Sequence, residues 1–265
     1  MVDHLPFENK VALVTGSARG IGFAAAKLLG SRGAKILLND ITNEPLRAAE
    51  ETLRSAGVEA ISKTGDVSEY QDCEAVVARA VERFGKIDIL INNAGLSIVS
   101  AFEECKPETC RKLVDVNVMG AINMTIAAIE HIKKSAGHIV FVSSVSGIRA
   151  IPTGSIYSAS KAFLRSLGES LRLELKKYGM HVGVIIPGFT TADAAKTVMK
   201  GDGSSRPINR PAHDTPEGVA MGIANLIENR ERERVLTPLG KLTAILQRLS
   251  PSLLDFLLQN RELKN

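Results

Sequence analysis

Aromatic residues are scarce in this chain: they make up 4% of its 265 residues, and tryptophan is absent. An excess of one charge is also missing, because 33 basic and 29 acidic residues leave a formal net charge of only +4. A nucleic-acid-binding surface usually combines a basic stripe with interleaved aromatic side chains. The sequence has neither, so we expect no nucleic-acid partner.

Cysteine is equally rare. The three cysteines, Cys73, Cys105 and Cys110, form no CxxC or Cys/His spacing, which argues against a disulfide framework and against a bound metal. Residues 1–9 lack the basic start and apolar run of a signal peptide. No uninterrupted apolar stretch approaches the about 20 residues of a spanning helix. We therefore expect a cytoplasmic protein, at most peripheral to a membrane.

Apolar runs of strand length alternate along the chain with longer segments of helical period. Strands are expected at 10–15, 35–38, 60–61, 87–91, 138–142, 181–186 and 235–236, and helices at 21–31, 44–56, 68–84 (capped by Ser68), 107–134 and 157–178. Nearly continuous Val/Ile/Leu strands of this kind are typical of a parallel sheet covered on both faces. Right-handed crossovers then predict a doubly wound, Rossmann-like α/β fold. With no repeat or linker, residues 1–265 are expected to form a single domain.

Two segments interrupt this alternation. Residues 190–216 are rich in Gly, Ser, Pro and Thr, and a long loop of this composition in a compact domain predicts a substrate lid. Residues 239–265 form a leucine-rich helical extension, in which Ser250-Pro251 indicates a second helix start.

The turn after the first strand carries three glycines in the spacing G-x-x-x-G-x-G. Gly16 permits a sharp turn, Gly20 lets a pyrophosphate approach the backbone, and Gly22 permits close packing of the following helix. Unpaired amides at the start of that helix would face the anion. Between a strand and a helix, this pattern indicates a dinucleotide-binding turn made of Gly16, Ser17, Arg19, Gly20, Ile21 and Gly22.

Asp40 ends the second predicted strand, about 20 residues beyond the glycines. A carboxylate there can accept hydrogen bonds from the adenosine ribose hydroxyls and repels a 2′-phosphate, which favours NAD. Arg19 in the glycine turn could instead meet a 2′-phosphate, so NADP remains an alternative. Asp40 could also be an ordinary surface acid.

Tyr157 and Lys161 lie four residues apart and share one helical face. An ammonium beside a phenol, with an oxidised nicotinamide nearby, stabilises the phenolate and lowers its pKa from the usual value of about 10 toward neutral pH. The phenol could then exchange a proton with a substrate oxygen while hydride moves at carbon. Such a pair alone is weak evidence. However, Ser144 and Asn93 follow other predicted strands, so they are expected at the same sheet edge.

With these residues, the chain resembles the short-chain dehydrogenase/reductase family from Asn9 to Leu236. The matching pieces are Thr15-Gly16-x-x-x-Gly20-x-Gly22, Asp66-Val67, Asn92-Asn93-Ala94-Gly95, Asn117, Ser144, Tyr157-x-x-x-Lys161 and Pro187-Gly188. In this order they are specific for the family.

The resemblance implies a role for each matching residue. Tyr157 would be the general acid/base, Lys161 would also bind the nicotinamide ribose, and Ser144, chosen over Ser143 by its spacing from Tyr157, would hold the substrate oxygen. Asn117 would anchor a water that relays protons from Lys161. The implied cofactor contacts are Asp66 and Val67 at the adenine, Asn93, Ala94 and Gly95 along the cofactor, and Pro187, Gly188 and Thr190 at the nicotinamide. Where the family often has a threonine, this chain has Ala192, so Thr190 or Thr191 would have to substitute.

The substrate pocket is expected to be lined by residues that follow predicted strands and are mainly apolar: Leu96, Ser97 and Ile98, residues 150–153 with Ile151, and Phe189. A hydrophobic secondary alcohol or ketone would suit them, such as a fatty-acyl, steroid or terpenoid-like molecule, although these residues could equally pack in the core. Two other functions remain open: an NADP-dependent ketone or 3-oxoacyl reductase, and a nicotinamide-binding regulator without catalysis.

The extension places Leu242, Ile245 and Leu249 at helical spacing, with Lys241 and Arg248 among them. One hypothesis is an amphipathic helix on a membrane surface. The preferred alternative is a helix packed over the substrate cleft or at a subunit interface, because apolar stripes are usually buried. The family resemblance also implies a homodimer or homotetramer formed through the two long helices.

Overall fold

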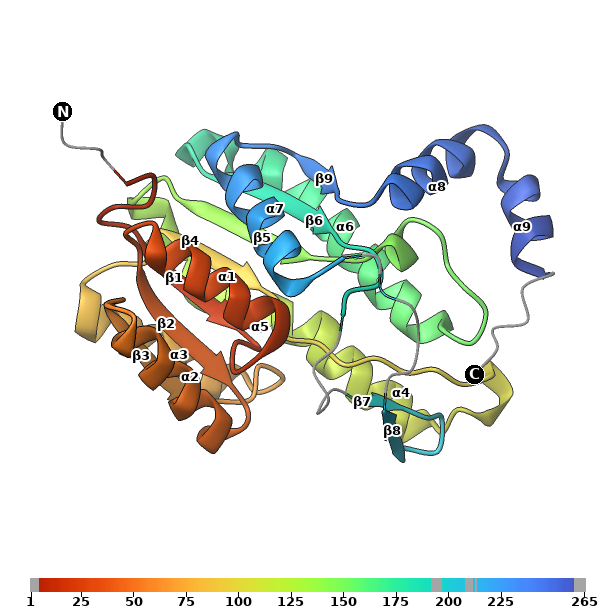
Figure 1. Ribbon diagram of the computed structural model, residues 1–265, viewed down its shortest axis with the longest axis horizontal. Helices are drawn as coiled ribbons and strands as arrows, with labels where there is room; N and C mark the ends of the chain where they lie inside the picture. Colours follow the sequence, from red (N-terminus) through yellow and green to blue (C-terminus); the bar gives the residue numbers. More distant parts are fainter. Residues whose placement is uncertain (1–4, 192–196, 208–211, 213, 260–265) are drawn as a thin grey trace.

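The computed structural model describes residues 5–191, 197–207, 212 and 214–259, and its centre is a seven-stranded parallel sheet (Figure 1). The strand order is β3-β2-β1-β4-β5-β6-β9. The strands are β1 (Val11–Thr15), β2 (Lys35–Asp40), β3 (Ala60–Thr64), β4 (Ile89–Asn92), β5 (His138–Val142), β6 (His181–Ile186) and β9 (Glu233–Val235). The order reverses between β1 and β4, and ligands of such sheets bind at the carboxyl ends of the strands beside that reversal.

Helices cover both faces of the sheet because successive residues of each strand point to opposite sides. Ala12 and Val14 of β1 belong to the core cluster with α1 (Gly20–Ser31), α2 (Asn43–Ser55) and α7 (Pro216–Glu228). Leu13 belongs to the other cluster, with α3 (Tyr70–Phe84), α5 (Gly120–Lys134) and α6 (Ser155–Leu175). The predicted doubly wound α/β fold is confirmed.

Two local predictions were wrong. Ser68 does not cap α3: the cap is Glu69, and the Ser68 hydroxyl donates to the Asp66 carboxylate at 2.7 Å. Helix α7 was not predicted, although it is largely buried against α1. Its start has a recognisable signal, since Pro216 is the first helical residue and the Thr215 hydroxyl accepts from the Gly218 amide at 3.0 Å.

The predicted helix 107–134 consists of α4 (Pro107–Val114), a π-helical turn (Asp115–Met119) and α5. By length and hydropathy alone this stretch could cross a membrane, but 44% of its most apolar window is buried inside the protein. A core helix of a soluble protein passes the same test, so the stretch is weak evidence for a membrane span.

The segment predicted as an irregular loop contains a short antiparallel hairpin, β7 (Thr197–Met199) and β8 (Ser205–Pro207). Main-chain hydrogen bonds fasten the hairpin to the loop after β4. The Met199 amide donates to the Ser97 carbonyl and the Val99 amide donates to the Met199 carbonyl, both at 2.9 Å. A third bond of 2.9 Å joins the Lys106 amide to the Gly201 carbonyl. Residues 192–196 (with Ala192), 208–211 and 213 of the predicted lid lie outside the described residues.

The predicted helical extension forms α8 (Pro238–Leu249) and α9 (Pro251–Gln259), and the new start at Pro251 is as expected. Figure 1 shows the two helices beyond β9, projecting from the body of the protein. Residues 260–265 lie outside the described part of the chain.

A histidine pair joins the starts of β5 and β6. The Nδ1 atoms of His138 and His181 are 3.3 Å apart, and Nε2 of His181 lies 3.0 Å from the Glu231 carbonyl oxygen. A carbonyl can only accept, so Nε2 of His181 carries a proton and its Nδ1 accepts from His138. Burial lowers the pKa of His138 to about 3 and also lowers the pKa of His181.

This pair predicts an acid-sensitive fold. In the unfolded chain both histidines titrate near pH 6.5, so below that pH the unfolded state binds more protons than the folded state. The free energy of unfolding should fall by about 1.4 kcal/mol per pH unit for neutral His138 as pH drops from 6.5 toward 5, and the lowered pKa of His181 adds to the fall. Urea unfolding at several pH values measures this slope. His138→Gln should make it shallower, and an unchanged slope would contradict the assignment; His131→Gln, outside the pair, is the control.

Candidate active site

A cavity of about 1320 Å³ lies at the carboxyl ends of the strands, between the loops that follow β1, β2, β4, β5 and β6. Ligand pockets usually measure about 300–1,000 Å³, so this one has room for a large cofactor together with a substrate. The predicted site residues that line it are Gly16, Arg19, Gly20, Ile21, Asp40, Asp66, Val67, Asn93, Ala94, Gly95, Ser144, Tyr157, Lys161, Pro187, Gly188 and Thr190.

Two predicted residues of the glycine turn, Ser17 and Gly22, lie behind the cavity wall. The Ser17 hydroxyl donates to the Asn39 carbonyl at 3.1 Å and accepts from the Asn39 amide at 3.0 Å, which ties the turn to β2. A Cβ added to Gly22 would lie 2.4 Å from the Gly16 carbonyl oxygen. Both residues therefore support the conformation of the turn without lining the cavity.

The front of the turn is open toward the cavity. Gly16 and Gly20 have φ values of +60° and +59°, which side chains disfavour. A Cβ built on Gly20 meets no atom within 4 Å. Helix α1 has no acidic side chain in its first turn, and Arg19 makes no side-chain cap, so the first amides are available to an anion. The open space at Gly20 therefore fits a diphosphate.

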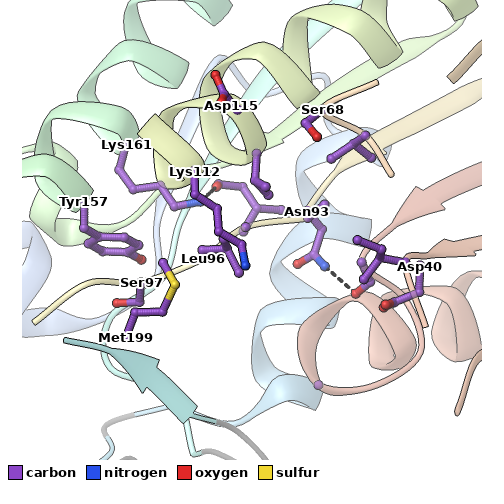
Figure 2. A pocket seen from close by; sticks show the side chains of 18 of the residues that line it. Asp40, Ser68, Asn93, Leu96, Ser97, Lys112, Asp115, Tyr157, Lys161 and Met199 are labelled. Carbon is purple, nitrogen blue, oxygen red and sulfur yellow. Dashed lines mark hydrogen bonds between the residues drawn. The ribbon is translucent and has the colours of Figure 1, made fainter. Parts of the chain in front are cut away.

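Asp40 lies at one end of the cavity, on the opposite side from Tyr157 (Figure 2). Its Oδ2 accepts from the Ala18 amide at 3.1 Å, and its Oδ1 accepts from the Thr42 amide at 3.3 Å. The Thr42 hydroxyl also donates to Oδ1 at 3.4 Å. Of the about four acceptor positions of a carboxylate, one on Oδ2 is therefore left for a hydroxyl group of a ligand.

Asn93 connects the end of β4 to the glycine turn. Its Nδ2 donates to the carbonyls of Thr15 and Gly16, both at 2.9 Å. The Thr15 hydroxyl in turn accepts from the amides of Asn93 and Ala94, both at 3.0 Å. Thr15 belongs to the glycine motif, but no role was predicted for it. Its hydroxyl fixes two cavity-lining segments relative to each other.

Tyr157 and Lys161 lie together at the other end of the cavity, with Ser97 and Met199 nearby (Figure 2). The Lys161 Nζ is 5.8 Å from the centroid of the Tyr157 ring, and it donates to the Val142 carbonyl at 2.9 Å. Lys161 is only 5% exposed, so its ammonium is held beside the phenol.

Ser144 begins a 3-10 turn (Val145–Gly147) at the same end. Its hydroxyl oxygen accepts from the Ser146 amide at 3.2 Å, and the residue lines the cavity. The neighbouring Ser143 hydroxyl donates to the Lys161 carbonyl at 2.7 Å. Ser143 thus secures α6, while the Ser144 hydroxyl hydrogen is available for a ligand.

Asn117 is buried in the π-helical turn and does not line the cavity. Its Oδ1 accepts from the Leu96 amide at 2.7 Å, and its Nδ2 donates to the Leu96 carbonyl and to the Ser160 hydroxyl, both at 3.0 Å. The side chain therefore positions the loop after β4. The water relay implied by the resemblance stays a prediction.

Three of the predicted substrate contacts, Ile98, Ile151 and Phe189, are not among the residues that line the cavity. Ile98 is 3% exposed and bridges to Met199. The neighbouring wall near Tyr157 instead includes Leu96, Ser97, Ile156 and Met199. Met199 and Ile156 were not predicted.

Neither Cys73 nor Cys105 lines the cavity. Burial raises the pKa of the Cys73 thiol to about 12, so this cysteine stays protonated. Cys110 lines the cavity on α4. Within the described ranges, no group of three or more His, Cys, Asp or Glu side chains could hold a metal ion.

A sequence model of the family described as short chain dehydrogenase matches residues 10–203, the part of the chain that forms this site. The chain belongs to the short-chain dehydrogenase family. It is therefore an oxidoreductase.

Relatives of this short-chain dehydrogenase cover most of its length. An uncharacterised oxidoreductase of Thermotoga maritima is 39% identical over 195 residues, covering 73% of this chain and 77% of the relative. The 11-beta-hydroxysteroid dehydrogenase-like 2 protein of Arabidopsis thaliana is 36% identical over 235 residues, covering 85% and 76%.

Solved structures of other family members share the architecture of the dehydrogenase. A short-chain dehydrogenase/reductase of Burkholderia phymatum in complex with NAD superposes with a TM-score of 0.83 at 27% identity, covering 94% of this chain and 96% of that one. A metagenomic short-chain oxidoreductase in complex with NADP gives a TM-score of 0.74 at 29% identity, covering 88% and 99%.

Proposed function

We propose that this dehydrogenase transfers a hydride between NAD(H) and a hydrophobic secondary alcohol or ketone, with Tyr157 as the general acid/base. The observation that carries the proposal is the arrangement of one cavity: a phenol beside an ammonium at one end, and a carboxylate beside a glycine turn at the other. An NAD complex in one relative and an NADP complex in another support a nicotinamide cofactor.

The chain's own residues supply the binding contacts. The amides at the start of α1 would hold the diphosphate, Asp40 the adenosine ribose, and Lys161 the nicotinamide ribose. Gly95 lies beside this last position, because a Cβ there would be in ordinary contact with the Lys161 Nζ at 3.5 Å. When bound, the nicotinamide donates or accepts the hydride.

Proton transfer is the task of Tyr157. A cation held at 5.8 Å favours the phenolate form of the ring. The Val142 carbonyl fixes that cation in place, so the phenol can give a proton to a ketone oxygen or take one from an alcohol. The Ser144 hydroxyl would donate to the same substrate oxygen and orient it.

The apolar side chains Leu96, Ile156 and Met199 line the cavity, which favours a hydrophobic substrate. The name of the Arabidopsis relative refers to a hydroxysteroid, which supports a lipid-like molecule. We also propose a cytoplasmic homodimer or homotetramer. Its interface would use the exposed Ile126 of α5 and Leu173 of α6, which lie on the two long helices.

Asp40 predicts the choice between NAD and NADP. The wild type should bind NADH at least about tenfold more tightly than NADPH, and Asp40→Asn should reduce that ratio by about tenfold. The amide removes the charge that repels a 2′-phosphate and keeps one acceptor oxygen for the Ala18 amide. Fluorescence titration with both cofactors measures the ratio.

The matched control is Glu44→Gln, which removes a carboxylate from the first turn of α2 without altering a residue that lines the cavity. The alternative is an NADP-dependent reductase, favoured by the presence of Arg19 in the cavity lining. Tighter binding of NADPH by the wild type would establish that alternative and overturn the choice of NAD.

A further inference from the structure

The two C-terminal helices present an apolar face to solvent. Leu239, Leu242, Ile245 and Leu249 of α8 are 51%, 52%, 54% and 78% exposed. At about 100° per residue, these positions fall on one side of the helix. Phe256 of the neighbouring α9 is also exposed, at 62%. We call the four residues of α8 the leucine face.

The opposite side of α8 is the one attached to the protein. Gly240 is buried, and a Cβ added there would lie 2.8 Å from the Val145 Cγ2. Arg149 holds both helices, because it donates to Gln247 of α8 at 3.3 Å and forms an ion pair with Asp255 of α9. The leucine face is therefore directed away from the body. Within the described chain these leucines do not pack over the cleft, and the other expected position, at a subunit interface, stays a prediction.

We propose that the leucine face docks the dehydrogenase onto an anionic phospholipid membrane. Lys241 and Arg248 lie beside the apolar residues on α8, at the edge next to Ile245, and α8 contains no acidic residue. The one acid of α9, Asp255, is neutralised by Arg149. Apolar side chains bordered by cations are the combination that binds an anionic lipid surface.

A second copy of the chain fits this face less well. A two-fold contact brings the same patch of both subunits together. Lys241 and Arg248 would then meet the same cations of the other copy, while α8 offers no carboxylate to pair with them. Lipid phosphates supply the missing negative charge.

The leucine face begins beside the substrate end of the cavity. A Cβ added to Gly188 would lie 2.8 Å from Thr237, the residue that caps α8, and Gly188 itself lines the cavity. Val145, which contacts the buried side of α8, directly follows Ser144. Docking would thus bring the substrate end close to the lipid surface. The further step, that a hydrophobic substrate enters from the membrane, rests on the proposed function.

Vesicle sedimentation tests the docking with the full chain. The wild type should sediment with vesicles made from equal parts of phosphatidylcholine and phosphatidylglycerol, and less so in high salt. The triple variant Leu242→Gln/Ile245→Gln/Leu249→Gln should lower the bound fraction by about tenfold or more. Met221→Gln, which changes a 41% exposed apolar residue on α7 outside the proposed subunit interface, should bind like the wild type.

The double variant Lys241→Glu/Arg248→Glu separates the two contributions. It should reduce binding to the anionic vesicles severalfold and leave any weak binding to pure phosphatidylcholine unchanged. Each variant should keep its NADH affinity, which shows that it is folded and makes the test independent of the catalytic proposal. Wild-type protein that stays in the supernatant would overturn the proposal. A triple variant that sediments with the vesicles like the wild type would also overturn it. So would a triple variant whose only change is a different oligomer mass in analytical ultracentrifugation.

Discussion

Replacing Tyr157 with phenylalanine is expected to lower kcat by about a thousandfold while NADH affinity stays within about twofold of the wild type. The substitution removes the one hydroxyl that exchanges the proton and keeps the ring that lies 5.8 Å from the Lys161 ammonium. Steady-state turnover of a ketone series, together with NADH fluorescence titration, measures both quantities on the same preparation.

Tyr178→Phe is the matched control, because it removes a phenol hydroxyl from the turn after α6, where the ring lies over Lys133 at 4.6 Å. Its kcat should not change. Appreciable turnover by Tyr157→Phe would refute the mechanism. Lack of turnover in the wild type with every alcohol and ketone tried, despite tight NADH binding, would favour the regulator without catalysis.

Gly22→Ala is expected to reduce NADH affinity by about a hundredfold. Alanine has a higher intrinsic helix propensity than glycine. A loss of NADH affinity would therefore be due to steric crowding by the added Cβ. The added Cβ would lie 2.4 Å from the Gly16 carbonyl oxygen and 2.6 Å from the Asn93 Nδ2. One of these two groups must move, and both help to fix the conformation of the glycine turn that would bind the diphosphate. Calorimetric titration with NADH measures the loss.

Gly30→Ala in the same helix separates this effect from general overpacking. Its Cβ would also meet an atom at 2.4 Å, but that atom is the Val58 Cγ1, away from the cavity. Gly30→Ala should therefore cost about 1–3 kcal/mol of stability and leave NADH affinity intact. Equal loss of affinity in both variants would show that the Gly22 contact has no specific role.

Most of the sheet could be predicted because its strands are short apolar runs, such as Val11–Thr15, that are buried on both faces. The hairpin β7–β8 could not, because each strand has three residues and because Met199 and Gly201 are held by hydrogen bonds to residues about a hundred positions away. Helix α7 could have been predicted from its Thr215-Pro216 start, which the preceding Gly- and Pro-rich stretch obscured.

The cofactor end of the cavity was predictable because motif residues sit at the ends of successive strands. The residues at the substrate end of the cavity were harder to predict. Ser97 and Ile98 are neighbours in an extended segment, where adjacent side chains point to opposite sides. Ser97 lines the cavity, and Ile98 is buried in contact with the hairpin. The sequence placed both residues in the pocket, and only the orientation of the backbone selects the serine.

The attachment of the β7–β8 hairpin has a consequence for how this enzyme could acquire new specificities. The bonds at Met199 and Gly201 join main-chain atoms, so they do not depend on which side chains the hairpin carries. Met199 can be exchanged for a smaller, larger or polar residue while its peptide groups stay fastened to Ser97 and Val99. The reacting groups lie on other elements, at β5 and α6. Randomising Met199 would therefore retune substrate choice on an unchanged reaction centre, which makes it a suitable first position for directed evolution.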